Sequence, residues 1–117
     1  MSSSVKKNTI TLTRGDTLRV KIDLLKDDEP YYPVEGDTIR FALKNVNKTA
    51  DGTEYVDQEP LILKTVPIDT MILQLDPEDT KPLGFKTYVY DLEITFADGT
   101  VDTFITEATF NLTGEVH

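Results

Sequence analysis

The segment from Lys86 to Leu112 constrains the fold most, because apolar and polar side chains alternate through it in two long runs. In the first run every second residue is aromatic or aliphatic: Tyr88, Tyr90, Leu92, Ile94 and Phe96. A period of two places these side chains on one face of a β-strand and the intervening residues on the other. Asp98-Gly99 then provides residues that tolerate positive φ, as a type I′ hairpin turn requires. The second run is expected to share an inward face made of Phe104, Thr106, Ala108, Phe110 and Leu112.

Shorter segments upstream follow the same alternation and predict further strands at 9–13, 17–25, 38–46, 61–66 and 71–75. Gly-Asp-Thr precedes two of them, at 15–17 and 36–38. This tripeptide is typical of a turn in which Gly reverses the chain and Asp or Thr bonds nearby amides. The polar stretch 47–58 is the longest segment without a pattern, and it predicts a mobile loop.

Residues 76–83 break the strand pattern and favour one helical turn. Asp76 is suited to the N-cap, Pro77 to the first helical position, and Glu78 and Asp79 to the positive end of the helix dipole. The strand that follows carries Tyr88 and Tyr90 near its start, where immunoglobulin domains place a tyrosine corner.

These patterns predict an all-β protein, an immunoglobulin-like two-sheet antiparallel β-sandwich of about seven strands with one short helical turn. The length of 117 residues suits one domain with a single core. We expect residues 1–7 to form a flexible N-terminal tail and residues 8–117 to form the sandwich domain.

The composition argues against several classes of partner. A net charge of −9 opposes binding to nucleic acid and to anionic membranes, which both require clustered Lys and Arg. No apolar run approaches the roughly 18 residues of a membrane span, and the N-terminus lacks the apolar middle of a signal peptide. The chain has no Cys, so it can form neither disulfides nor a thiolate site.

The side-chain inventory argues against an enzyme. The only serines are Ser2, Ser3 and Ser4, and the only histidine is His117, so no serine or cysteine nucleophile is paired with a histidine base within the fold. Carboxylates cluster at 27–29 and 76–79 without the spacing of a known calcium loop. We therefore expect no catalytic residue, no metal and no cofactor, and we interpret these acids as solvated.

Two groups of residues are candidates for an interaction surface: the aromatics Tyr31, Tyr32 and Tyr55, and the outward acids Asp91, Glu93 and Asp102. The tyrosines suit an oligomer interface better than a sugar-stacking platform, and the acids suit a solvated or partner-facing sheet surface. Arg14-Gly15-Asp16 spells an integrin-binding tripeptide, but its use as a turn is the favoured interpretation. The strand from Phe104 to Leu112 is the one expected to pair with another subunit.

Several motifs in this order resemble a known protein type: Arg14 to Thr17, Gly36 to Phe41, Leu75 to Lys81, Tyr88 to Leu92, Asp98-Gly99 and Phe110 to Thr113. Over residues 8–113 the chain resembles small immunoglobulin-like domains of phages and prophages of Gram-positive bacteria. These include the N-terminal domain of siphophage baseplate upper proteins and related tail or virion proteins. The chain departs from that pattern at Lys86, where related sequences have Gly, and in its longer 47–58 segment.

The resemblance implies a structural protein of a phage or prophage tail, baseplate or other part of the virion. It implies a non-catalytic assembly and protein–protein interaction module that partners itself as a homo-oligomer, other virion proteins, or both. Its implied location is the virion, after assembly in the bacterial host cytoplasm. The alternative is a carbohydrate-binding module that recognises host cell-wall sugars through Tyr31, Tyr32 or Tyr55.

Overall fold

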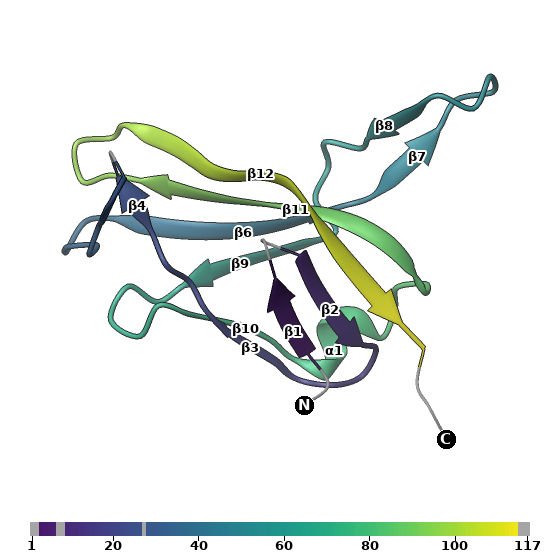
Figure 1. The fold of residues 1–117 in the computed structure, drawn as a ribbon, viewed down its shortest axis with the longest axis horizontal. Coiled ribbons are helices and arrows are strands. Elements are labelled where there is room, and N and C mark those ends of the chain that lie inside the picture. Colours follow the sequence, from purple (N-terminus) through teal and green to yellow (C-terminus); the bar gives the residue numbers. More distant parts are fainter. Residues whose placement is uncertain (1–2, 7–8, 27, 115–117) are drawn as a thin grey trace.

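The structure is a computed structural model that describes residues 3–6, 9–26 and 28–114. Figure 1 shows strands throughout and a single helical turn, α1 (Pro77–Thr80), within these residues. The fold is therefore all-β, as the alternation predicted. The chain forms one large sheet, a strand pair that packs against it, and two small hairpins.

The large sheet has six strands in the order β1, β2, β12, β11, β6, β9. Their bounds are β1 (Ser3–Lys6), β2 (Thr9–Thr13), β12 (Val101–Thr113), β11 (Lys86–Thr95), β6 (Thr38–Lys44) and β9 (Ile62–Val66). β2 runs parallel to β12, and every other neighbouring pair in this sheet is antiparallel. The hairpin of β11 and β12 lies at the centre of the sheet. The segment with the clearest alternation in the sequence therefore supplies the two central strands.

A second layer is formed by β3 (Leu18–Lys21) and β10 (Ile72–Leu75), which pair antiparallel. Leu18, Leu73 and Leu75 are fully buried and belong to the same hydrophobic core as the buried side chains of the large sheet. Two hairpins complete the fold: β4 (Leu25–Lys26) with β5 (Glu29–Pro30), and β7 (Val46–Lys48) with β8 (Glu54–Val56). Figure 1 shows β7 and β8 projecting from the body of the molecule.

Burial in the core confirms the predicted inward faces of most strands. The side chains at 3% exposure or less include Ile10, Leu12, Ile39, Phe41, Leu43, Tyr88, Tyr90, Leu92 and Ile94. The ring centroids of Phe41 and Tyr90 lie 5.4 Å apart, and Tyr90 meets Phe110 edge-on at 6.5 Å. These contacts between β6, β11 and β12 form an aromatic centre for the core.

The turn between β11 and β12 differs from the expected type I′ turn. Gly99 has a φ of 91°, whereas Asp98 is not among the described residues with positive φ. The Gly99 amide donates to the Phe96 carbonyl at 2.9 Å, and the Phe96 amide donates to the Thr100 carbonyl at 2.8 Å. The loop therefore has one more residue, Ala97, and needs a left-handed conformation only at its final glycine.

A β-bulge in β12 corrects the predicted inward face of this strand. Tyr90 is opposite Ala108 and Leu92 is opposite Ile105, so β12 has an extra residue between these pairs, and a second register shift follows between Leu92 and Glu93. Glu107 occupies the bulge with a φ of 47°. Because the extra residue shifts the alternation, Ile105 turns toward the core and Thr106 is exposed, contrary to the sequence expectation.

The predicted mobile loop at 47–58 is instead largely the β7–β8 hairpin. At its base the Asp57 amide donates to the Asn45 carbonyl at 2.9 Å, and at its tip the Asp51 carboxylate accepts from the Thr53 amide at 3.0 Å. The sequence did not predict this hairpin, because both faces of its strands lie outside the core and therefore show no alternation of apolar residues.

The N-terminal tail expected over residues 1–7 falls partly outside the described residues, which begin at residue 3 and omit residue 7. Within that segment, Ser3–Lys6 form β1 and pair antiparallel with β2. Backbone pairing to an open sheet edge requires no apolar side chain, so a polar sequence can still extend a sheet.

Candidate functional site

The most structured polar site surrounds Asp37, a carboxylate that is only 7% exposed. It immediately precedes β6 and bonds two other segments of the chain. Its Oδ2 accepts from the Tyr31 hydroxyl at 2.7 Å and from the Val34 amide at 3.0 Å, and its Oδ1 accepts from the Ala97 amide at 3.0 Å. Asp37 therefore fixes the 31–34 loop and the β11–β12 turn at one end of the molecule.

These hydrogen bonds set the protonation of both partners. The Val34 amide, followed by the Tyr31 hydroxyl, stabilises the charged form and lowers the pKa of Asp37. The same hydrogen bond to Asp37 is the main cause that raises the pKa of Tyr31. The Thr100 amide accounts for the lowered pKa of Asp98 in the neighbouring turn.

Gly36 permits this junction because its backbone lies against the β11–β12 turn. It has a φ of 100°, and a Cβ at this position would lie 2.8 Å from the Ala97 Cβ. Both the backbone conformation and the close approach therefore require glycine. The sequence prediction that this Gly-Asp-Thr forms a turn with an amide-binding Asp is confirmed at Asp37.

The Tyr31 ring forms part of a shallow aromatic surface at this end. It meets the Phe96 ring edge-on at 5.6 Å. Nζ of Lys26 lies 5.4 Å from the Tyr31 ring centroid and 4.9 Å from the Phe96 ring centroid. These are cation–π distances, so the lysine is held over the two rings.

Two open grooves flank Leu24, Leu25 and Tyr31, which line both of them. The first has a volume of about 540 Å³ and reaches the start of β12 at Val101. The second has a volume of about 610 Å³ and is bordered by Tyr32. Both grooves have the size range of small-ligand sites, but their walls come from short loops and strand ends.

The three candidate tyrosines do not form one platform. Tyr31 is half-buried and its hydroxyl is bound to Asp37. Tyr32 is 79% exposed beside the second groove, and Tyr55 is 50% exposed on β8. Figure 1 shows β4 and β8 at opposite ends of the view, so Tyr55 is separated from the Tyr31 loop.

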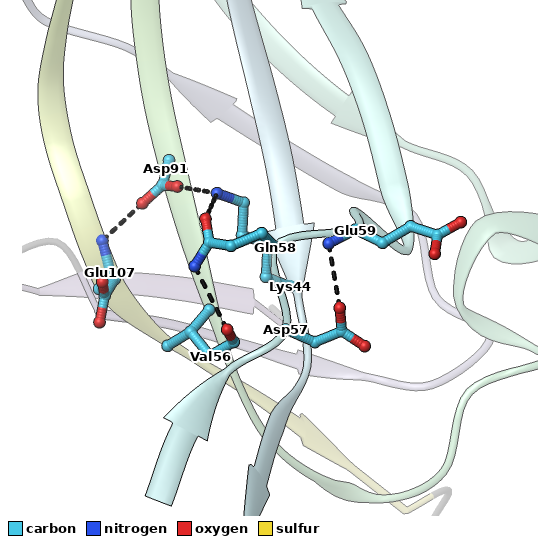
Figure 2. A network of polar contacts seen from close by, with 7 residues as sticks. All are labelled: Lys44, Val56, Asp57, Gln58, Glu59, Asp91 and Glu107. Atoms are coloured by element: carbon cyan, nitrogen blue, oxygen red, sulfur yellow. Dashed lines mark hydrogen bonds and ion pairs between the residues drawn. The ribbon is translucent and has the colours of Figure 1, made fainter.

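The three candidate acids are also dispersed, and each has a different environment. Asp91 accepts from the Glu107 amide at 2.7 Å through Oδ1, and its Oδ2 lies 2.8 Å from Lys44 Nζ (Figure 2). Its main contacts thus stabilise the bulge of β12. Glu93 makes an exposed ion pair with Arg40 at 4.0 Å, while Asp102 lies on the rim of the first groove.

Lys44 also connects the sheet with the base of the β7–β8 hairpin. Its Nζ donates to Gln58 Oε1 at 3.1 Å, and Gln58 Nε2 donates to the Val56 carbonyl at 3.2 Å (Figure 2). Only 16% of the Lys44 side chain and 18% of the Asp91 side chain are exposed, so this pair is better shielded than the Arg40–Glu93 pair.

The Arg14-Gly15-Asp16 turn is integrated into the fold. The guanidinium carbon of Arg14 lies 4.3 Å from the Phe85 ring centroid, and its Nη1 donates to the Leu83 carbonyl at 3.4 Å. The Gly15 amide donates to Thr80 Oγ1 at 3.3 Å. These contacts support the interpretation of the tripeptide as a turn.

Over the part of the chain that the structure describes, no helix is long and apolar enough to cross a bilayer. Within the same residues, no three His, Cys, Asp or Glu side chains are grouped so that they could hold a metal ion.

Known proteins offer no match to this chain: no family, no curated protein and no solved structure is significantly similar. The resemblance to phage immunoglobulin-like domains therefore stays a prediction.

Sequence reasoning missed the two grooves and the residues that line them. Leu25 and Val101 are 64% and 56% exposed. Each lies at the end of a strand, where the alternation of residue types does not predict which way a side chain faces. Lys26 lies beside the 27–29 carboxylates, a charged run that favours solvent over a binding surface. The signal for Asp37, its position after Gly36, was present and was interpreted as local turn chemistry.

Proposed function

We propose that this chain is a non-catalytic, immunoglobulin-like assembly module of a phage or prophage virion, in its tail, baseplate or another structural part. The single observation that carries the assembly function is the open polypeptide edge and adjoining groove at the start of β12. Exposed strand edges with nearby apolar surface are a common basis for protein–protein assembly.

The immunoglobulin-like part of the proposal is supported by strand order. β12, β11 and β6 are consecutive neighbours in one sheet and β9 adds to β6, while β3 pairs with β10 in the opposing layer. In a variable-type immunoglobulin domain, strands G, F, C and C′ are neighbours in the same way, and B pairs with E. On this correspondence β11 is strand F.

A tyrosine contact supports the same correspondence. The Tyr88 hydroxyl donates to the Gly84 carbonyl, four residues upstream, at 2.8 Å. Tyr88 is 3% exposed and lies near the start of β11. A tyrosine corner has this arrangement: the hydroxyl of a tyrosine near the start of strand F bonds the backbone just before that strand.

The virion assignment rests on the sequence resemblance, and its test is association with defined partners. The chain would be co-expressed with each product of its neighbouring genes, and complexes would be detected by light scattering and chemical crosslinking. We expect a stoichiometric complex with a tail or capsid protein, or a defined homo-oligomer. A strict monomer that binds none of these products would contradict the proposal.

The carbohydrate alternative has a separate test. The arrangement of the tyrosines supports at most Tyr32 as an exposed stacking residue. A glycan array with Tyr32→Ala as the control measures this activity directly, and binding that this substitution abolishes would favour the carbohydrate function over assembly.

A further inference from the structure

In the described part of the chain, the first half of β12 has a strand neighbour on one side only, although β12 is a central strand of the large sheet. β2 pairs with β12 only over Phe110–Thr113, whereas β11 pairs with β12 from Val101 onward. Among the described residues, no strand pairs with residues 101–108 on the side away from β11. An unpaired edge of this kind presents amide and carbonyl groups that a further strand can bond.

The hydrogen-bond pattern identifies the groups that face this edge. The Phe96 amide bonds the Thr100 carbonyl, so this pair is hydrogen-bonded. In an antiparallel ladder the bonded pairs alternate, so Asp102 also bonds β11, while Val101 and Thr103 direct their amides and carbonyls away from it. A register shift between the Leu92–Ile105 and Glu93–Thr103 pairs ends this regular stretch at Thr103, and the bulge at Glu107, whose amide is turned to Asp91, follows it.

The same stretch borders the first groove. Its lining includes Val101 and Asp102, Leu24 to Lys26, and Ile94 and Phe96 of the β11 region. Ile94 is buried, whereas Leu25 and Val101 expose most of their surface. A strand added at the edge would therefore place every second side chain against apolar atoms.

The charge of the groove distinguishes between two possible occupants, a second copy of this chain and a different protein. Asp98 and Asp102 line this groove, and Lys26 is the single cation in its lining. Lys26 is held over the Tyr31 and Phe96 rings. A second copy would bring the same acids to the same edge and adds its own net charge of −9. The complementary occupant is a different chain that carries Lys or Arg.

We propose that the open edge at 101–103 and its groove bind an extended peptide strand of another protein, with alternating aliphatic residues and flanking Lys or Arg. The inference rests on the proposed assembly function and specifies the partner of that function. Backbone pairing supplies the position, the aliphatic side chains enter the groove, and the basic residues meet Asp98 and Asp102.

The probe is a short blocked peptide of alternating valine and threonine with a lysine at each end, titrated into the whole chain. Amide hydrogen exchange and NMR shifts locate its binding, and fluorescence anisotropy measures its affinity. We expect the Val101 and Thr103 amides to become protected. We also expect N-methylation of alternate peptide bonds to abolish binding, and terminal glutamates in place of the lysines to weaken it about tenfold.

Protein variants give an independent readout. Thr103→Pro removes an edge amide that does not bond β11, so it should abolish binding while the fold persists. Should that variant fail to fold, the exposed substitution Asp102→Lys keeps the test decisive, and it should weaken binding about fivefold to tenfold. Asp23→Lys is its matched control, an exposed acid outside this groove, and should leave the affinity unchanged.

Protection at another edge, binding that N-methylation does not affect, no binding at millimolar peptide, or a dimer formed through β12 would each overturn the inference. If the peptide fails while the chain still forms a complex with a tail or capsid protein, the proposed function stands and only this edge is wrong. If both assays fail, the assembly function is also wrong.

Discussion

At the scale of single residues, Asp37 has the greatest influence on one end of the molecule. It is buried, yet it is charged, and it accepts three hydrogen bonds from two segments, the 31–34 loop and the β11–β12 turn. A buried carboxylate that accepts several donors is stabilised in its charged form, and its removal leaves those donors unsatisfied.

We predict that Asp37→Asn lowers the free energy of unfolding by about 1–3 kcal/mol at neutral pH, because hydrogen bonds to a charged acceptor are lost. Urea denaturation measures the change. Asp23→Asn, at an exposed acid, is the control and should leave stability within about 0.5 kcal/mol of the parent.

The same substitution should change the acid dependence of stability. The folded-state pKa of Asp37 is lowered, so below about pH 4 the unfolded chain binds protons more readily than the folded chain. The parent should therefore lose stability as the pH falls through this range, and its advantage over Asp37→Asn should shrink. A constant difference across the acid range would show that the Asp37 charge has no such role.

A second residue-scale prediction concerns the Tyr88 hydroxyl, which bonds the Gly84 carbonyl at 2.8 Å. Tyr88→Phe keeps the buried ring and removes only this bond, so it should lower the free energy of unfolding by about 1 kcal/mol. Tyr32→Phe, at a highly exposed ring, should have no measurable effect in the same urea titration. Equal effects of the two substitutions would argue against a tyrosine corner.

At the scale of elements, the bulge in β12 explains why the sequence predicted some features and missed others. Alternation identified β11 and its buried face, because nothing interrupts its period of two. It failed in the middle of β12, where register shifts turn Ile105 toward the core and expose Thr106, although Ala108, Phe110 and Leu112 keep the predicted inward face. Nothing in the residue types around Glu107 indicates the insertion, since a left-handed Glu is unusual.

The bulge itself is testable through Glu107. Its φ of 47° is unfavourable for a residue with a side chain and acceptable for glycine. Glu107→Gly should therefore leave the free energy of unfolding unchanged or raise it by up to about 1 kcal/mol. Thr106→Gly, one residue earlier and without positive φ, should lower it by about 1 kcal/mol. Destabilisation by both substitutions to the same extent would contradict this bulge geometry.

The β7–β8 hairpin is an element that the fold should tolerate losing. None of its residues belongs to the buried core, and its base is closed by the Asp57 amide and Asn45 carbonyl. We predict that replacing residues 46–56 with Asn-Gly changes the free energy of unfolding by no more than about 1 kcal/mol. Thermal and urea denaturation check this, and a cooperative loss of structure would show that the hairpin supports the core.

At the scale of the whole molecule, the sequence predicted the all-β class and the core strands, because both depend on local alternation. The candidate surface was predicted less well. Tyr31 and Asp91 had an exposed, polar pattern in the sequence, but the fold bonds Tyr31 to Asp37, just before β6, and Asp91 to the Glu107 amide of the neighbouring strand. Long-range pairing decides such uses, and a local pattern contains no information about it.

Global stability should depend strongly on β2. Leu12 is fully buried in β2, which pairs with β12. Leu12→Ala should lower the free energy of unfolding by about 2–5 kcal/mol, because it removes apolar contacts and leaves a cavity. Thr9→Ala on the same strand is the matched control and should cost less than about 1 kcal/mol. Equal small effects would mean that β2 is peripheral to the core.

The parallel pairing of β2 with β12 also has a consequence for synthesis of the protein. Ile10 is opposite Phe110, and Thr13 is opposite Thr113, so strands from early and late in the described chain meet directly. During translation, β2 leaves the ribosome long before its partner exists, and it stays without that partner until β12 has passed through the exit tunnel. The large sheet is therefore completed only after β12 has been synthesised, and chaperones can bind the apolar face of the earlier strands until then.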